Sequence, residues 1–265
     1  MDEFNAVIIE NQEIKTGIYN LRIEVESNFN AIPGQFINIY LDRPDMVLPR
    51  PISICDAEKN NIRLLYQIVG KGTDYLAKMK CGERIRAAGP LGNGFNIQQE
   101  GNGKVLLIGG GIGAPPLLFL AKTLKSAQAV LGFRSASAAI LTDEFTSLGC
   151  ETVIATDDGS LGYKGNAMDA ANSLINNKDI SMNDNRGISI IYACGPRIML
   201  RMIAEYASAN DIPCQISMEE HMGCGIGACS CCPVPVIENG RQAYKKLCKD
   251  GPVFSASSIV WEGIS

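Results

Sequence analysis

Histidine is almost absent from this chain, which has a single one, His221, among 265 residues. Catalytic triads with histidine, multi-histidine metal sites and histidine acid–base chemistry are therefore nearly excluded, and a Rieske-type cluster would need a second histidine. We expect His221 to have a surface or packing role. The chain also lacks a strong excess of charge of either sign, because 24 basic and 28 acidic residues leave a net charge of only −4. No nucleic-acid partner is expected from this balance.

Long hydrophobic runs are missing too. The longest uncharged stretch, 105–121, is interrupted by glycine and proline and is shorter than the roughly 20 residues that a membrane helix needs. The opening residues, MDEFNAVIIE, lack the basic and apolar regions of a secretion signal. We therefore expect no membrane partner and a cytoplasmic location. In that reducing compartment the ten cysteines would be thiols rather than disulfides.

Cysteine is plentiful, and four of the ten form a motif near the C-terminus. Cys224, Cys229 and Cys232 have the spacing C-x4-C-x2-C, and Cys248 follows after fifteen intervening residues. Plant-type ferredoxins hold a [2Fe–2S] cluster with this kind of spacing. The intervening glycines allow tight turns that aim backbone N–H groups at sulfur. We predict that these four thiolates ligate a [2Fe–2S] cluster and that the protein transfers electrons.

A structural zinc site is the weaker interpretation of the same cysteines. Such sites usually show two separated C-x2-C pairs, and only one is present here. Cys231 is a fifth cysteine in the loop. The spacing favours Cys232 as the ligand, but an exchange between the two stays open.

The first hundred residues predict β-structure. Apolar and polar residues alternate at 19–25, 36–41 and 63–69, and glycine- and proline-containing turns separate these runs. Several short strands at such spacing predict a small antiparallel β-barrel. The polar run at 98–103 is typical of a linker.

The pattern then changes to that of an α/β domain. Short apolar strands are predicted at 105–108, 129–133, 152–155 and 188–192, and helices at 116–124, 166–175 and 197–208. This alternation is typical of a doubly wound parallel sheet. We therefore divide the chain into a β-barrel (1–99), an α/β domain (100–215) and a small [2Fe–2S] module (216–265).

A glycine-rich loop follows the first strand of the α/β part. Its sequence GGGIGAPPL contains Gly109, Gly111, Gly113 and Pro116, between a predicted strand and a predicted helix. Glycines let the backbone approach a pyrophosphate, and the helix N-terminus offers N–H groups to it. The next strand ends in LGFRS, without the usual acidic residue, and Arg134 could favour a 2′-phosphate. The choice between NADH and NADPH therefore stays open.

Three shorter motifs could belong to the same site. Arg50 in RPIS has a guanidinium that can pair with phosphate. The sequence GKGT, which ends at Thr73, predicts a turn that presents N–H groups and a hydroxyl. Cys194 in CGP follows a predicted strand at the carboxyl end of the sheet, where such folds bind ligands, although a buried structural cysteine is an equal alternative.

Taken in order, RPIS, GKGT, GPLGNGF, GGGIGAPPL and CGP resemble the motifs of the ferredoxin–NADP⁺ reductase superfamily. The C-terminal sequences SMEEHMGCGIGAC and CKDGPVF resemble more narrowly the electron-transfer subunits of the NAD-dependent, two-subunit dihydroorotate dehydrogenases. The resemblance covers essentially the whole chain. It departs at Ser230-Cys231-Cys232, where an aromatic residue and a small residue more commonly precede the cysteine.

The resemblance implies that the barrel (1–99) binds FAD, which would lie between it and the α/β domain. It also implies that the α/β domain (100–215) binds NAD(H) at the glycine-rich loop. It implies that electrons pass between NAD(H) and an FMN-containing dihydroorotate dehydrogenase catalytic subunit in pyrimidine (UMP) biosynthesis, in a heterotetramer of two plus two chains. The FAD contacts would be Arg50, Pro51, Ile52, Ser53, Leu65, Tyr66, Gln67, Gly72 and Thr73. Cys194 would lie near the nicotinamide–flavin contact, and Glu219 and Glu220 have no assigned role.

No general base is expected, because the cofactors supply the chemistry. Two other functions stay open. The first is an FAD and [2Fe–2S] subunit of an NAD(P)H:ferredoxin or sulfide-type oxidoreductase. The second is a non-enzymatic, zinc-stabilised regulator built on a degenerate reductase fold.

Overall fold

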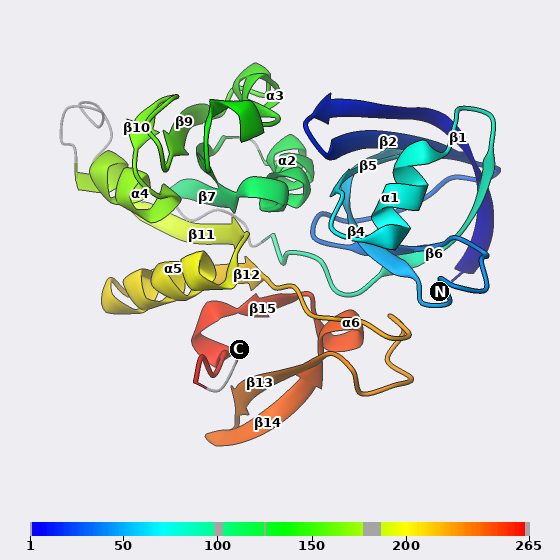
Figure 1. The fold of residues 1–265 in the computed structure, drawn as a ribbon. Coiled ribbons are helices and arrows are strands. Elements are labelled where there is room, and N and C mark those ends of the chain that lie inside the picture. Colours follow the sequence, from blue (N-terminus) through cyan, green and yellow to red (C-terminus); the bar gives the residue numbers. More distant parts are fainter. Residues whose placement is uncertain (1, 98–102, 125, 177–186, 263–265) are drawn as a thin grey trace.

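The computed structural model describes residues 2–97, 103–124, 126–176 and 187–262. This part of the chain contains a closed six-stranded barrel, a seven-stranded sheet flanked by helices and a two-stranded C-terminal sheet (Figure 1). The barrel stands beside the helix-flanked sheet, and the C-terminal sheet lies below the latter in the view of Figure 1. The predicted linker at 98–103 falls almost entirely outside the described residues.

The barrel is antiparallel and has the strand order β1-β2-β5-β4-β3-β6. Its elements are β1 (Asp2–Lys15), β2 (Ile18–Val25), β3 (Phe36–Tyr40), β4 (Arg50–Glu58), β5 (Asn61–Gln67), α1 (Lys71–Lys78) and β6 (Arg84–Leu91). Successive side chains of a strand point to opposite faces, so the alternating apolar residues all reach one side. There they close a core that includes the fully buried Ile23, Ile37, Ile54 and Leu64.

The larger sheet has the order β10-β9-β8-β7-β11-β12-β15, and all of its strands are parallel except β15. Its strands are β7 (Lys104–Gly110), β8 (Gln128–Phe133), β9 (Glu151–Thr156), β10 (Tyr163–Lys164), β11 (Ile188–Cys194), β12 (Cys214–Ser217) and β15 (Val253–Ser255). Its helices are η1 (Gly111–Gly113), α2 (Ala114–Thr123), η2 (Ala136–Ala138), α3 (Thr142–Ser147), α4 (Ala167–Asn176), α5 (Arg197–Ala209) and η4 (Ala256–Ser258).

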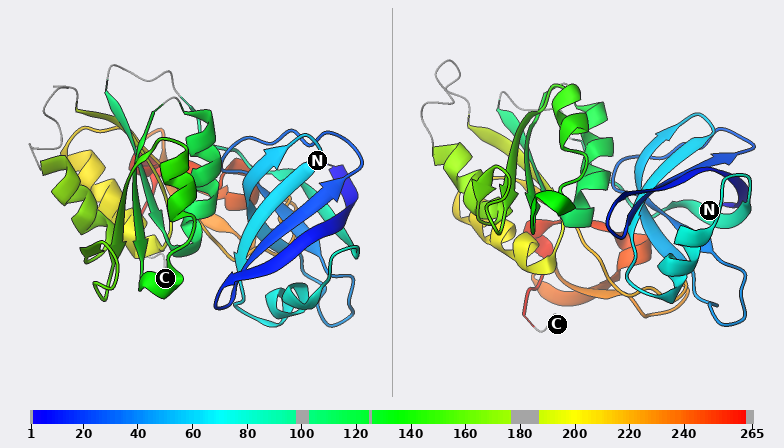
Figure 2. Two further views of the ribbon diagram at one scale, coloured as in Figure 1. Left: turned by 90° about the horizontal axis from the view of Figure 1, so that it is seen from above. Right: turned by 45° about the horizontal axis from the view of Figure 1, so that its top comes forward.

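Both faces of this sheet are covered. Along β7, Val105 and Leu107 pack in the cluster that contains α2 and α3, whereas Leu106 and Ile108 pack with α4 and α5. Figure 2 shows α2 and α3 on the side of the barrel and α4 and α5 on the far side. A strand buried on both faces has no polar side, which is why these segments are continuously apolar in the sequence.

The barrel and the sheet share an apolar interface through α2. Cys55 and Leu65 of the barrel belong to the same core as α2, and Phe119 of α2 belongs to the core of the barrel. Two ion pairs border this contact. Arg63 on β5 holds Glu144 on α3 with two hydrogen bonds of 2.5 and 2.9 Å, and Lys122 pairs with Asp56.

The C-terminal segment leaves the sheet and returns to it. After β12, residues 218–232 form a loop without helix or strand, followed by the hairpin β13 (Pro233–Glu238) and β14 (Arg241–Lys246). Helix α6 (Leu247–Asp250) contains Cys248, and β15 then pairs antiparallel with β12. The segment between β12 and β15, which includes this loop, is therefore held at both of its ends by the same edge of the large sheet.

The predicted barrel and doubly wound sheet are both present, and the strands predicted at 36–41 and 188–192 are observed at 36–40 and 188–194. One expectation was wrong. The GKGT sequence is not an isolated turn, because Gly70 is the N-cap of helix α1. The returning strand β15 was not predicted. Among the described residues, no helix is long and apolar enough to cross a membrane.

Candidate functional site

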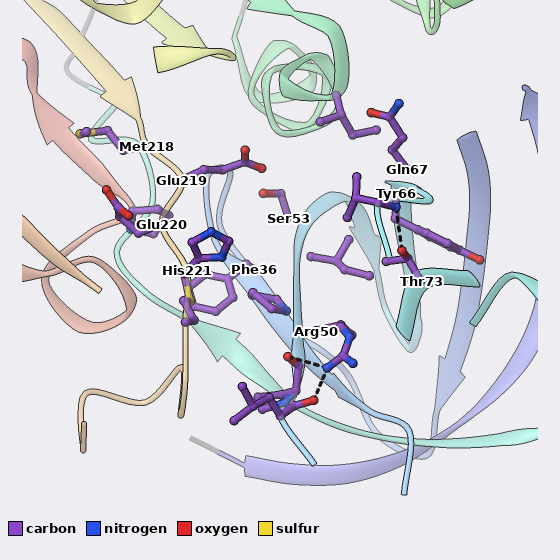
Figure 3. Close-up of a pocket in the computed structure, with 18 of the residues that line it drawn as sticks. Phe36, Arg50, Ser53, Tyr66, Gln67, Thr73, Met218, Glu219, Glu220 and His221 are labelled. Carbon is purple, nitrogen blue, oxygen red and sulfur yellow. Dashed lines mark hydrogen bonds between the residues drawn. The ribbon is translucent and has the colours of Figure 1, made fainter. Parts of the chain in front are cut away.

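A cavity of about 950 Å³ lies where the barrel, the large sheet and the start of the C-terminal loop meet. Its barrel side includes Arg50, Ser53 and Thr73, and its opposite side includes Glu219 and His221 (Figure 3). The ends of β7 and β11 also contribute, through residue 112 and residues 195–197. Segments that are far apart in the sequence therefore border one space.

The guanidinium of Arg50 covers the first turn of α1. A Cβ atom on Gly72 would lie 1.9 Å from Arg50 Nε, so glycine leaves room for the arginine. Arg50 Nη1 donates to the carbonyl oxygens of Leu48 and Pro49, at 3.4 Å for Pro49. The guanidinium therefore lies beside a helix N-terminus, where the first N–H groups have no intrahelical partner. Together these donors suit an anion such as phosphate.

Thr73 organises that helix start. Its Oγ1 accepts hydrogen bonds from the N–H groups of Val69 and Gly70, at 2.9 and 3.3 Å, and donates to the Gly70 carbonyl at 3.1 Å. The residue is 8% exposed. Its hydroxyl is thus already engaged in fixing the turn that borders the cavity.

Strands β4 and β5 form the floor of the cavity on the barrel side. The predicted flavin contacts on them all line it: Pro51, Ile52, Ser53, Leu65, Tyr66 and Gln67. The hydroxyl of Tyr66 donates to Asn11 Oδ1 at 3.0 Å, and its ring stacks on Tyr19. Burial raises the pKa of Tyr66 above its usual value. The phenol is therefore held by the barrel and stays neutral.

The glycine-rich loop packs tightly against the Cys-Gly-Pro loop. A Cβ atom on Gly113 would lie 2.3 Å from the Cys194 carbonyl oxygen, and one on Gly110 would lie 2.7 Å from Pro196 Cδ. The two loops meet because β7 and β11 are neighbouring parallel strands. Gly111 differs, since its φ is +52° and the space beside it is open. A ligand could approach the backbone at Gly111.

The remaining residues of the predicted nucleotide loop lie inside the protein. A Cβ atom on Gly109 would lie 3.1 Å from a Leu131 methyl carbon, and Pro116 is buried in the first turn of α2. They shape the loop by packing.

Cys194 is buried beside the cavity rather than lining it. The pKa of its thiol is raised to about 12, mainly by burial and to a smaller extent by the nearby Glu219 carboxylate, while a hydrogen bond with Ser217 opposes the change. The thiol is therefore protonated at neutral pH and is a poor nucleophile.

The acidic pair after β12 occupies the opposite wall of the cavity. Glu220 forms an ion pair with Arg197, whose guanidinium also donates to the Glu219 carbonyl at 3.4 Å. The Glu219 carboxylate borders the open cavity and is accessible to solvent, yet the surrounding walls limit its hydration. This desolvation raises the pKa of Glu219 above its usual range.

Several residues of this wall were missed by sequence reasoning. Phe36, Ile112, Met218 and Pro252 all line the cavity. Ile112, Met218 and Pro252 stand in motifs quoted above, but their apolar side chains gave no reason to single them out, and for Phe36 the only signal was the alternating pattern of its strand. Such residues become recognisable only when the fold brings them together.

Three of the motif cysteines, Cys224, Cys229 and Cys232, lie in the loop 218–232, the cysteine loop, and the fourth, Cys248, lies in helix α6. Cys232 and Cys248 are buried, with their Sγ atoms 3.4 Å apart, and Cys224 and Cys229 are partly exposed. Backbone N–H groups point at the other sulfurs: Cys229 N–H lies 3.3 Å from Cys224 Sγ, and Cys224 N–H lies 3.5 Å from Cys229 Sγ. The contacts thus group the sulfurs as two pairs.

A short turn links these two pairs. Ile226 N–H donates to Cys224 Sγ at 3.5 Å, and Gly227 N–H donates to Cys248 Sγ at 3.1 Å. The turn uses the positive φ of Gly225 and Gly227, at +68° and +81°. Such N–H groups stabilise thiolate charge.

The surroundings give the cysteine thiols of this region different pKa values. Hydrogen bonds from backbone N–H groups lower the pKa of Cys229 to about 6, whereas burial raises the pKa of Cys248 to about 12. Cys231 is exposed, and its hydrogen bond with Cys229 raises its pKa. Among the described residues, no three His, Cys, Asp or Glu side chains converge as a single-ion site requires. Two pairs of thiols fit a two-iron cluster, with one pair for each iron.

The comparisons with known proteins agree with this chemistry. Residues 219–260 match the model of the iron-sulfur cluster binding domain of dihydroorotate dehydrogenase B. A dihydroorotate dehydrogenase B (NAD(+)) electron transfer subunit from Desulforamulus reducens is 39% identical over 88% of this chain and 88% of its own. Its counterpart from Caldanaerobacter subterraneus is 37% identical over 98% of this chain and 99% of its own.

The solved structures include a close relative of the same architecture. A chain of an NADH-dependent reduced ferredoxin-NADP oxidoreductase superposes with a TM-score of 0.83 and 31% identity, covering 97% of this chain and 90% of that one. The matched iron-sulfur domain gives no support to the zinc-stabilised regulator. The identities above 35% over nearly the whole length lead to one assignment: the chain belongs to the family of dihydroorotate dehydrogenase B (NAD(+)) electron transfer subunits.

Proposed function

We propose that this chain passes electrons between NAD(H) and an FMN-containing dihydroorotate dehydrogenase catalytic subunit, using FAD and a [2Fe–2S] cluster. When bound, FAD supplies hydride chemistry and the cluster supplies one-electron transfer. A single observation carries the proposal: one cavity is bordered by the RPIS strand, the glycine-rich and Cys-Gly-Pro loops, and the start of the cysteine loop.

We assign FAD to the barrel side of the cavity. Arg50 with the first turn of α1, at Gly72 and Thr73, would hold its phosphates, because a guanidinium and free N–H groups lie together there. The wall formed by Pro51, Ile52, Ser53, Leu65, Tyr66 and Gln67 would lie along the ring and sugar parts. The neutral phenol of Tyr66 and the buried Ile52 keep that wall free of charge.

We assign NAD(H) to the loop that contains Gly109, Gly111, Gly113 and Pro116. Gly111 would let the dinucleotide approach the backbone, while Gly109, Gly113 and Pro116 keep the loop packed on the sheet. Cys194 would stand behind the nicotinamide as a protonated, uncharged thiol. Its role would be to position the ring and exclude water, because orientation is the main requirement of hydride transfer.

We assign Cys224, Cys229, Cys232 and Cys248 as cluster ligands. The buried Cys232, 3.4 Å from Cys248, suits this role better than the exposed Cys231. The N–H groups of residues 224, 226, 227 and 229 would stabilise the charge of the bound thiolates. No residue has to act as general base.

The remaining parts of the proposal concern organisation. We divide the chain into the barrel (1–99), the α/β domain (100–215) and the cluster module (216–265), and we expect two such chains to assemble with two catalytic subunits. The thiols found at all ten cysteines are consistent with a cytoplasmic location.

The decisive experiment is anaerobic, NADH-dependent reduction of orotate by this chain co-purified with an FMN-containing catalytic subunit. The expected result is activity that requires both chains, with flavin and iron–sulfur absorption bleaching together. Activity of the catalytic subunit alone with NADH would contradict the proposal. Mass measurement of the purified complex would test the two-plus-two assembly.

A second candidate is an FAD and [2Fe–2S] subunit of an NAD(P)H:ferredoxin or sulfide-type oxidoreductase. It is favoured by the likeness to the NADH-dependent reduced ferredoxin-NADP oxidoreductase, at 31% identity. The dihydroorotate dehydrogenase B relatives are more similar to this chain, at 37–39% identity, and therefore favour the first function over this one. This second function would be preferred if NADH reduces the chain and the chain then reduces ferredoxin but does not bind the dihydroorotate dehydrogenase subunit.

A further inference from the structure

Asn38 is a polar residue in the middle of barrel strand β3. Its neighbours Ile37 and Ile39 point into the barrel core and are fully buried, so Asn38 points outward by the alternation of the strand. An outward-facing residue of a barrel normally meets solvent. Asn38 has 0% exposure instead. Something outside the barrel therefore covers it.

The cover is the cysteine loop, 186 residues further along the chain. Asn38 Nδ2 donates to the backbone oxygen of Cys224 at 3.2 Å. A Cβ atom on Gly225 would lie 2.2 Å from the same nitrogen and 2.8 Å from Asn38 Oδ1. Glycine at 225 therefore serves two purposes: it permits the positive φ of the turn, and it leaves room for the amide.

The same strand also borders the cavity assigned to FAD. In the β3–β4 ladder Asn38 stands opposite Pro51, and Phe36 stands opposite Ser53. Phe36, Pro51 and Ser53 all line the cavity. Asn38, which bonds the first cysteine of the loop, is thus only two residues along β3 from Phe36 in the cavity wall.

We propose that Asn38 is a positioning residue that fixes the cysteine loop to the flavin side of the barrel and so sets the separation of the two redox sites. The inference rests on the cofactor assignments proposed above. Electron transfer needs the two sites close and fixed, and β3 is a stiff, doubly paired strand with β4 on one side and β6 on the other. Asn38 couples the loop to that strand.

The interaction is specific for an amide. Leucine has a similar size but cannot donate, so Asn38→Leu would leave the Cys224 carbonyl without this donor. Serine can donate but is too short to span the gap. Asn38 Oδ1 has no hydrogen-bond partner among the described residues, so the amide acts on the loop through its Nδ2 donor alone.

Asn20 offers a matched control. It is another buried asparagine of the barrel, 5% exposed, and its hydrogen-bond partners Glu10 and Arg63 belong to the barrel and not to the cysteine loop. Asn20→Leu removes a buried amide from the same barrel and leaves the loop contacts intact. Differences between Asn38→Leu and Asn20→Leu therefore report on the loop rather than on loss of a barrel amide.

The test uses the full chain with FAD and reconstituted cluster, prepared anaerobically, for wild type, Asn38→Leu, Asn38→Ser and Asn20→Leu. Three quantities are measured: the electron paramagnetic resonance spectrum of the reduced cluster, the rate of cluster loss to an iron chelator, and the rate of cluster reduction after mixing with NADH. For both Asn38 variants we expect a shifted or broadened spectrum. We also expect the cluster to be lost on the order of tenfold faster and to be reduced on the order of tenfold more slowly than in wild type.

The outcomes separate this inference from the proposed function. Asn38 variants that match Asn20→Leu in all three measurements would overturn the positioning role, and the milder Asn38→Ser decides the question if Asn38→Leu does not fold. A wild-type chain that binds FAD but shows no [2Fe–2S] spectrum would instead overturn the ligand assignment.

Discussion

The barrel wall of the cavity and the cysteine loop are neighbours built in opposite ways. The wall residues around Arg50–Ser53 stand on strands whose other face is a closed apolar core, so their positions follow from the barrel itself. The loop 218–232 contains no helix or strand, and its path depends on positive-φ glycines and N–H···S contacts. One site is set by packing, and the other by contacts with sulfur.

The difference predicts how each site responds to losing its cofactor. The barrel core stays filled whether or not a ligand lies in the cavity, so the wall should be rigid in both states. The loop would lose the group that holds its sulfurs together. It would keep its weak N–H···S hydrogen bonds, the Asn38 contact, the Arg197–Glu220 ion pair and the hydrogen bond from Lys246 Nζ to the Gly227 carbonyl. Metal sites of this kind commonly gain much of their local order on binding.

The largest effect should follow from removing one cluster ligand. In Cys229→Ser a hydroxyl replaces the thiol whose pKa the backbone lowers to about 6. We expect loss of the iron–sulfur absorption and a fall of at least about 100-fold in orotate reduction with the partner subunit, at the upper end of ligand-shell effects. Anaerobic visible spectroscopy and the coupled assay measure both, and NADH should still bleach the flavin at the wild-type rate.

Cys231→Ser is the control for this change. Cys231 is the exposed cysteine of the loop, and its replacement should leave cluster and activity in place. If Cys231→Ser loses the cluster and Cys232→Ser keeps it, the two cysteines exchange roles. If Cys229→Ser reduces orotate at the wild-type rate, the loop does not lie on the electron path, and the role assigned to the cysteine loop is wrong.

Removing the cluster from the wild-type chain should loosen the loop and spare the barrel. We expect amide hydrogen exchange at residues 219–232 to accelerate by at least about tenfold after chelation, because the loop has few backbone hydrogen bonds of its own. Exchange in β3 and β5 should stay unchanged. Mass spectrometry of the two forms measures this, and equal acceleration in the barrel would show that the cluster supports both regions.

The barrel wall can be perturbed by a single methyl group. In Gly72→Ala the new Cβ would lie 1.9 Å from Arg50 Nε, and the flexible guanidinium would have to move. We expect FAD to bind roughly tenfold more weakly, since a charge-assisted hydrogen bond is worth about 1.5–3 kcal/mol. Flavin titration followed by fluorescence measures the affinity, while the cluster spectrum should not change.

Gly70→Ala gives the matched control. Gly70 is extended, with a φ of −179°, and a Cβ there would meet nothing within 4 Å. Its flavin affinity should equal that of wild type. Equal weakening in both variants would mean that helix α1 itself was disturbed and that Arg50 is not the cause.

These two regions also differed in how far they could be predicted from the sequence. The cysteine spacing and the alternation of β3 depend on local patterns, and both predicted the correct element or chemistry. Helix α1 was missed because glycines at 70 and 72 are typical of turns, whereas its stability comes from packing of Leu76 in the barrel. The contact of Asn38 with Cys224 joins positions 186 residues apart, and no local pattern contains it.

The smallest effect should follow from removing the ion pair of Arg63 with Glu144, which connects the barrel to the large sheet. The Arg63 guanidinium, through its hydrogen bonds, lowers the pKa of Glu144 below the usual value of 4.5. A lowered pKa stabilises the fold above the unfolded value, and this contribution is lost as pH falls through the folded pKa. Glu144→Gln should therefore destabilise the chain at pH 7 and less so near pH 4.

The size of that effect is limited by solvent, because the Glu144 side chain is 43% exposed. We expect a loss of about 0.5–1 kcal/mol at pH 7, as for other partly exposed pairs. Urea unfolding at both pH values measures it, with Glu205→Gln as the control, since that fully surface pair with Arg201 should matter less. A loss that is the same at both pH values would assign the effect to packing. The charge of Glu144 would then contribute nothing to holding the barrel against the sheet.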